Sequence, residues 1–271
     1  ALPIYNVWNY KKVMFLYVSS LTEIRIYNCN SKPQRLENSE QSVGLHEIVA
    51  SKFSDTNKLN QILEIFSAHA IDSGSLWFRD NEYLEKIKLK NRIDKFLVTS
   101  LISLTRKLEE DNIALDVIHS LIMRSLFIMY LEDKGATPVE FYEGSSSRAC
   151  TYFDLLDDNN ATYSFFEKIQ KHFNGNVFPV TPLEQKQIKL RHLQLIKQCL
   201  INGDLNNENL FRDWRVFKFD IINIELLSEI YENFLSEIDK EISGSYYTPV
   251  ELVELMLNEV LPIDSTNYKV K

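Results

Sequence analysis

The sequence predicts a mainly α-helical protein with a small β element near its amino terminus. Apolar residues recur at helical spacing through most of the chain from about Gly44 onward, and β-branched and aromatic residues gather in short runs only before it. The 271 residues include seven glycines, and no two of them are close enough to form a G-x-G phosphate loop. A doubly wound nucleotide-binding domain normally carries such a loop, so the glycine spacing also favours helices.

The β element is predicted within residues 1–44. Two β-prone runs, Val13–Val18 and Glu23–Cys29, are separated by Ser19–Thr22, and this arrangement is typical of a hairpin. The second run alternates, with Ile24 and Ile26 on one side. A hairpin of this size requires a surface to pack against, so we expect further structure beside it.

Helical periodicity predicts a series of helices of unequal length and spacing, without a repeat period. They cover Leu59–Ala70, Asn81–Asp111, Ile113–Lys134, Phe153–Leu156, Thr162–Phe173 and Glu184–Ile201. The helix Ile113–Lys134 is the most apolar, so we expect it to be central and to end at Gly135 as a C-cap. Arg124 and Glu132 on this buried helix need partners, and we interpret them as packing and ion-pair residues.

The stretch Glu225–Pro262 predicts two helices joined by a short turn. Ser243, Gly244 and Ser245 interrupt the periodicity of the first helix. Thr248 is placed to cap the second helix, with Pro249 at its first position and Glu251 completing a T-x-x-E capping box.

Composition limits the class of protein. The formal net charge of −8 has the wrong sign for a chain whose whole surface binds nucleic acid, so local basic stripes would have to supply any such contact. Cys29, Cys150 and Cys199 are widely spaced and suggest neither a disulfide framework nor a zinc site. No signal peptide or apolar run of spanning length is visible, so we expect a cytoplasmic protein without a membrane partner.

The string G-S-Y-Y-T-P followed by V-E-L-V-E-L-M, behind a helix containing I-Y-E-N-F-L, resembles a known family. It resembles the entry into the catalytic domain of N6-adenine DNA methyltransferases of restriction–modification systems, the gamma-type amino-methylases of the type I M-subunit or type IIG kind. The resemblance implies that Tyr246, Tyr247, Thr248 and Pro249 lie beside the cofactor S-adenosylmethionine. The segment R-S-L-F-I-M-Y-L-E-D-K-G, Arg124–Gly135, also resembles a segment of the helical region ahead of such methylases.

The family pattern has two further motifs that are missing from this sequence. Neither a D-P-x-C-G-S-G loop nor an N-P-P-[YF] motif occurs in it. We therefore expect an amino-terminal fragment that ends ahead of the glycine-rich motif, is catalytically incomplete and contains no catalytic residue. The expected domains are a β element at 1–44, a helical domain or connector at 45–240, and at 241–271 the first helix of an α/β methyltransferase domain.

The resemblance implies double-stranded DNA as a partner, and two basic stripes are candidates for contacting its phosphates. Lys88, Arg92 and Lys95 share one face of the predicted helix Asn81–Asp111, and Lys186 and Lys189 belong to another helix. An ordinary solvated helix face, balanced by nearby Glu and Asp, is the favoured interpretation of each stripe.

For the tryptophans and histidines, too, a functional role has a structural alternative. Trp77 and Trp214 are of the type that stacks on an extruded base, although most tryptophans belong to cores. His69, His119 and His172 are interpreted as core or surface residues rather than ligands or bases.

Fusions of this kind often carry a metal-dependent nuclease domain upstream, with D…E-x-K on adjacent strands. The strings Glu132-Asp133-Lys134 and Glu184-Gln185-Lys186 fall on helical patterns, so we predict no nuclease site and no metal. The alternative function is a non-catalytic helical connector or partner-docking module that links nuclease, methylase or specificity subunits. A specificity or restriction subunit is accordingly an expected partner.

Overall fold

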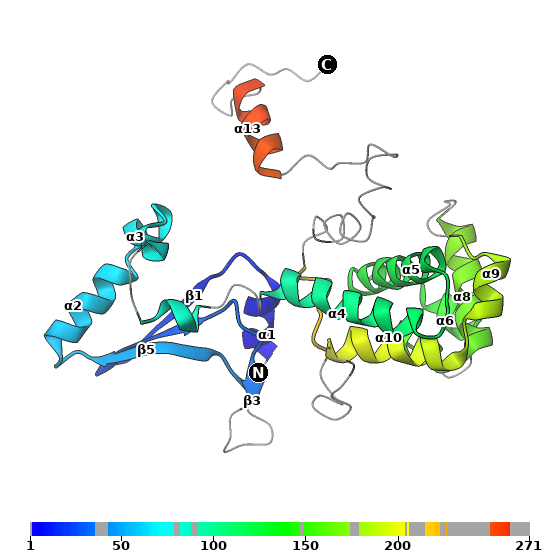
Figure 1. Ribbon diagram of the computed structural model, residues 1–271, viewed down its shortest axis with the longest axis horizontal. Helices are drawn as coiled ribbons and strands as arrows, with labels where there is room; N and C mark the ends of the chain where they lie inside the picture. The colour runs from blue at the N-terminus through cyan, green and yellow to red at the C-terminus, as the bar shows by residue number, and fades with distance from the viewer. Residues whose placement is uncertain are drawn as a thin grey trace. The chain divides into compact units, whose positions relative to one another are not determined.

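The computed structural model describes residues 2–35, 43–78, 82–87, 92–146, 149–173, 179–203, 205, 215–222, 226 and 250–260. Over these residues the chain is mostly helical with a small three-stranded antiparallel sheet, which confirms the predicted coarse fold class (Figure 1). The chain divides into two compact units, Ala1–Asn223 and Ile224–Lys271, and each is described by itself.

The predicted hairpin forms two strands of the sheet. Strand β1 (Phe15–Ser19) pairs antiparallel with β2 (Glu23–Asn28), and β2 pairs with a third strand, β5 (His46–Lys52). A separate two-stranded ladder joins β3 (Gln34–Arg35) to β4 (Val43–Gly44).

Strand β5 corrects the expectation of helix from Gly44 onward. The pairing of β2 with β5 shifts register between Ile26 and Tyr27, so that Ile26 lies opposite Val49 and Tyr27 opposite Glu47. This bulge allows the consecutive residues Ile48 and Val49 both to be buried. The strand therefore lacks the period-2 alternation by which strands are recognised in a sequence.

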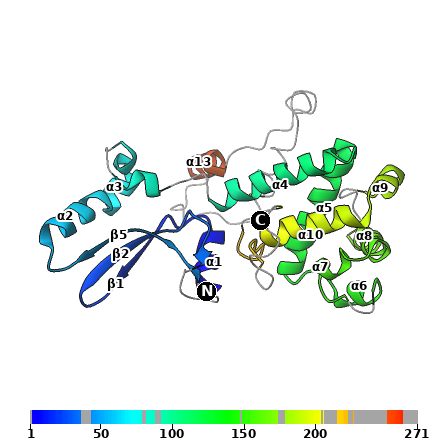
Figure 2. The same cartoon turned by 60° about the horizontal axis from the view of Figure 1, so that its bottom comes forward.

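Short helices cover one face of the sheet, as Figures 1 and 2 show for α2. They are α2 (Thr56–Ile65), α3 (Ala68–Asp72), and the 3₁₀ turns η1 (Ser75–Trp77) and η2 (Leu84–Lys86). Ile62, Ile65 and Phe66 pack with Phe15 and Ile26 in one apolar cluster. This cluster supplies the surface that the predicted hairpin required.

The rest of the first unit is a helical bundle built on α5 (Leu115–Asp133). Around it lie α4 (Ile93–Glu109), α6 (Val139–Glu143), α7 (Tyr152–Leu155), α8 (Asn159–His172), α9 (Pro182–Gln187) and α10 (Leu190–Asn202). Ten α5 residues are buried, which confirms its predicted central place. Gly135, at φ 68°, follows α5 with Schellman-type hydrogen bonds from Gly135 N–H to the Glu132 carbonyl and from Ala136 N–H to the Leu131 carbonyl.

Three predicted helices are interrupted. The helix at Leu59–Ala70 is divided because the Ser67 hydroxyl accepts a hydrogen bond from Ala70 N–H and starts α3. The helix at Asn81–Asp111 begins only at Ile93, since Tyr83 and Ile87 belong to the sheet cluster instead. The helix at Glu184–Ile201 divides where Ile188 and Lys189 take extended backbone angles between α9 and α10.

An unpredicted amino-terminal helix, α1 (Leu2–Asn9), joins the two ends of the first unit. The Asn9 amide donates to the Val216 carbonyl at 3.1 Å and accepts from Lys218 N–H at 3.0 Å. Trp8 packs edge-on against Phe96, which in turn contacts Phe217. Residues 215–222 are also held by α5, because Asp133 accepts from the Arg215 guanidinium and from Phe219 N–H.

In the second unit the structure describes α13 (Val250–Val260) and residue 226. The helix begins directly after the predicted Thr248–Pro249 start signal. Its described apolar side chains are exposed, among them Val253, Leu257 and Val260.

Candidate functional site

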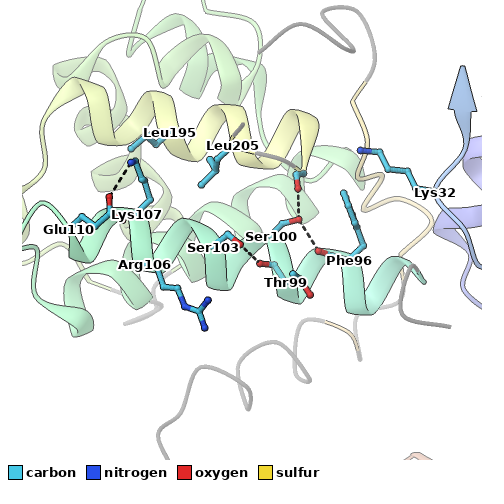
Figure 3. Close-up of a pocket in the computed structure, with 11 residues that line it drawn as sticks. Lys32, Phe96, Thr99, Ser100, Ser103, Arg106, Lys107, Glu110, Leu195 and Leu205 are labelled. Carbon is cyan, nitrogen blue, oxygen red and sulfur yellow. Dashed lines mark hydrogen bonds and ion pairs between the residues drawn. The ribbon is translucent and has the colours of Figure 1, made fainter. Parts of the chain in front are cut away.

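A pocket of about 480 Å³ lies against α4 and α10 in the first unit (Figure 3). Its lining comes from three parts of the chain: the loop after β2, α4, and the carboxyl end of α10 with the residues that follow. The lining residues are Lys32, Phe96, Thr99, Ser100, Ser103, Arg106, Lys107, Glu110, Leu195, Gly203 and Leu205.

Gly203 fixes the end of the pocket wall. It caps α10 at φ 68°, where its N–H donates to the Cys199 carbonyl, and its own carbonyl accepts the Ser100 hydroxyl at 2.5 Å. A Cβ at this position would lie 2.3 Å from Phe96 Cε1, inside van der Waals contact. The backbone conformation and the aromatic neighbour therefore both require glycine here.

Lys32 places a positive charge at this end of the pocket. Its ammonium donates to the Asn202 carbonyl at 3.2 Å and lies 4.6 Å from the centre of the Phe96 ring. The carbonyl and the aromatic face hold the side chain in place.

The pocket is positive although the chain is negative. Lys32, Arg106 and Lys107 oppose the single carboxylate of Glu110, so the lining has a formal charge of 3 − 1 = +2, against −8 for the whole chain. The Lys107–Glu110 pair at 3.0 Å is exposed on both sides and contributes little to stability. Arg106 forms no ion pair with any residue that the structure describes.

The first predicted basic stripe is partly a structural feature. Lys88 lies outside the described residues. Arg92 precedes α4 and donates from Nε and Nη2 to the buried carboxylate of Asp94, which Lys11 also contacts at 3.2 Å. Burial alone would raise the pKa of Asp94, but the hydrogen bond from Arg92 and the charges of Lys11 and Arg92 lower it to about 2. Lys95 remains exposed on α4.

The second predicted stripe lies elsewhere in the unit. Lys186 is exposed on α9, and Lys189 is the exposed N-cap residue of α10. The predicted cofactor residues Tyr246, Tyr247, Thr248 and Pro249 lie outside the described residues, as does Trp214.

The two E-x-K strings supply ion-pair and hydrogen-bonding partners for the bundle. Arg124 Nη1 and Nη2 donate to the two Glu184 oxygens at 2.6 and 3.0 Å, and both side chains are buried. Glu132 accepts from the Tyr142 hydroxyl and from Tyr152 N–H. Arg124 and Glu132 thus have the structural partners that were predicted. Over the described ranges, no group of three or more His, Cys, Asp or Glu residues could hold a metal ion.

The best-connected histidine was not singled out in the sequence. His192 is buried, accepts from Lys189 N–H through Nδ1, and places Nε2 3.1 Å from Asp111. Burial, followed by the charge of Arg191, lowers the pKa of its imidazole. Its Nδ1 thus caps the amino end of α10. His172 packs between Phe141 and Phe173.

Comparisons of this chain with protein-family models, with curated proteins and with solved structures each find no match. Among the described helices, none has the length and apolarity needed to cross a membrane.

Sequence reasoning did not single out the pocket. Its residues come from regions of the sequence around 32, 96–110 and 195–205, which only the packing of α4 against α10 brings together. The one local signal is the L-T-R-K string at 104–107, which places Arg106 and Lys107 on the exposed part of a helix whose Leu104 is buried.

Proposed function

We propose that this chain belongs to an N6-adenine DNA methyltransferase of a restriction–modification system. It would supply the helical part of that enzyme and the first segment of its catalytic domain. The observation that carries the proposal is the string G-S-Y-Y-T-P-V-E-L-V-E-L-M at 244–256. The start of α13 at Val250 supports it, because a helix directly after Thr-Pro is what the family pattern has at this point.

The proposed cofactor is S-adenosylmethionine, whose methyl group would be transferred to the amino group of adenine. Tyr246–Pro249 would border this cofactor, with the tyrosine rings giving apolar contact and the Thr248 cap fixing the start of the next helix. The groups that would hold the adenine are not assigned to residues of this chain, since it has no N-P-P motif.

The alternative is a non-catalytic helical connector or docking module for a specificity, nuclease or methylase subunit. The exposed apolar side chains of α13 favour it, because Leu255, Met256 and Val260 suit a protein surface as their partner. The two functions differ in whether methyl transfer occurs.

The test is methyl transfer by the full-length product of the gene that encodes this sequence. Incubation with S-adenosylmethionine and DNA should yield N6-methyladenine, measured by mass spectrometry after hydrolysis of the DNA. Tyr247→Ala should lower the rate by about tenfold or more, since loss of the proposed contact between its ring and the cofactor would cost about 1.5–3 kcal/mol. Tyr247→Phe should retain most of the activity.

The matched control is Tyr10→Ala, which removes an exposed tyrosine of the first unit and should leave the rate unchanged. Absence of N6-methyladenine with the unaltered protein would refute the methyltransferase and leave the connector.

A further inference from the structure

The exposed face of α4 carries a stripe of cations and hydroxyls, here called the α4 stripe: Lys95, Thr99, Ser103 and Arg106. All four residues are exposed. At 100° per residue, Lys95, Thr99 and Arg106 lie within about 40° of one another around the helix axis. Figure 3 shows Arg106 extending from the side of α4 turned away from α10.

The cations of the α4 stripe are available to a ligand. Neither Lys95 nor Arg106 forms an ion pair with a described residue, whereas Arg92, Arg124 and Arg215 each bind a carboxylate within the fold. The Thr99 hydroxyl makes no hydrogen bond to a described residue, while Ser103 donates to the Thr99 carbonyl and keeps its oxygen as an acceptor.

The adjoining pocket extends this positive surface around α4. Lys107, on the side of α4 nearer α10, and Lys32, at the Gly203 end, add two further cations. The donors offered are thus ammonium and guanidinium groups with a hydroxyl between them. This is the set that binds phosphate oxygens in charge-assisted hydrogen bonds.

The length of the stripe fits a ligand with a row of phosphate groups, such as a nucleic-acid backbone, better than a single phosphate ion. Lys95 and Arg106 are eleven residues apart, a rise of about 16 Å along the helix, which equals about five base pairs measured along a duplex axis at about 3.4 Å per base pair. One small anion cannot contact both residues. A nucleic-acid strand running along α4 can contact both.

We infer that the α4 stripe, together with the pocket between α4 and α10, binds the phosphate backbone of double-stranded DNA. The choice of duplex DNA rests on the proposed function, and the surface itself rests on the geometry above. Contacts of this kind give sequence-independent affinity that falls with salt, and they position a protein on its site without reading bases.

The experiment compares two double variants that each remove two positive charges. Lys95→Ala with Arg106→Ala alters the α4 stripe, and Lys52→Ala with Lys58→Ala alters two exposed lysines of β5 and α2. Binding of this chain to a fluorescent duplex of about 20 base pairs is measured from ~20 mM to ~200 mM salt, because the net charge of −8 opposes binding and low salt favours detection. Thermal unfolding establishes that both variants fold.

The α4 double variant should bind about tenfold more weakly and should lower the slope of log K against log salt by about 2, since each lost phosphate contact removes about 0.9. The β5–α2 variant should bind within about twofold of the unaltered chain. The inference fails if the unaltered chain does not bind at low salt, or if the α4 variant loses no more affinity than the control. A single-stranded oligonucleotide bound more tightly than the duplex would also overturn it.

This binding assay contains no methyl donor, so its failure is distinct from failure of the proposed function. Loss of DNA affinity in the α4 variant together with absence of methyl transfer would keep the surface and refute the methyltransferase. Methyl transfer by the full-length protein with an unaltered α4-variant affinity would do the reverse.

Discussion

Gly203 and Gly135 are the same residue type in the same left-handed backbone conformation, but their surroundings differ. Both have φ 68° and follow a helix. A Cβ at Gly135 would meet nothing within 4 Å, whereas at Gly203 it would meet Phe96 and Phe217. Alanine variants at the two positions therefore separate the energetic cost of a left-handed backbone conformation from the cost of steric overlap.

Gly135→Ala should lower the free energy of unfolding by about 1–2 kcal/mol, the cost of placing an alanine in the left-handed region. Gly203→Ala should cost at least about 2 kcal/mol more, because the Phe96 ring must move and overpacking adds to the backbone term. Urea unfolding followed by circular dichroism measures both. Equal losses for the two variants would show that the Phe96 ring moves aside without a further loss in the free energy of unfolding.

At the scale of the elements, the ion pair Arg124–Glu184 connects α5 to α9, a helix of only six residues. The Tyr163 hydroxyl on α8 also donates to Glu184 at 3.2 Å, and the Arg124 guanidinium lies 4.6 Å from the Phe166 ring. A short helix that buries one carboxylate between a guanidinium and a tyrosine hydroxyl depends on that carboxylate for its place.

Glu184→Ala should therefore destabilise the first unit by about 3–5 kcal/mol, since it removes the carboxylate that binds the buried Arg124 guanidinium. The double variant Arg124→Met with Glu184→Leu should recover most of this loss by replacing the pair with apolar groups. Glu167→Ala, an exposed glutamate of α8, is the control and should shift stability by less than about 0.5 kcal/mol. A double variant as unstable as Glu184→Ala would contradict this account.

Elements could be predicted where one local pattern determined them. The apolar length of α5, its closing glycine and the alternation of β2 were sufficient. The failures share one physical reason, which is that tertiary packing overrode the local pattern. Residues 83–87 pack on the sheet instead of continuing α4, and the bulge in β5 removes the alternation of Ile48 and Val49. The pocket was not predictable, because its residues meet only after α4 packs on α10.

At the scale of the whole first unit, Asn9 connects α1 to residues 216–218 across most of the sequence of that unit. Its side chain is buried and satisfies one backbone carbonyl and one backbone N–H. The same region contains the aromatic contacts of Trp8, Phe96 and Phe217.

Asn9→Leu should lower the free energy of unfolding by about 2–6 kcal/mol, because one buried and one part-buried backbone group lose their hydrogen bonds at about 1–3 kcal/mol each. The matched control is Asn60→Ala on the exposed face of α2, which should be nearly neutral. Hydrogen exchange should show faster exchange at 216–222 in Asn9→Leu, and unchanged exchange there would contradict the assignment.

The separation between Asn9 and Val216, 207 positions along the chain, has a consequence for biosynthesis. At a translation rate of about 5–20 residues per second, the ribosome synthesises α1 roughly 10–40 s before residues 216–218, whose backbone Asn9 binds. Until then the aromatic group of Trp8, Phe96 and Phe217 is incomplete, which makes the nascent segment around α1 a natural client for chaperones that shield apolar segments.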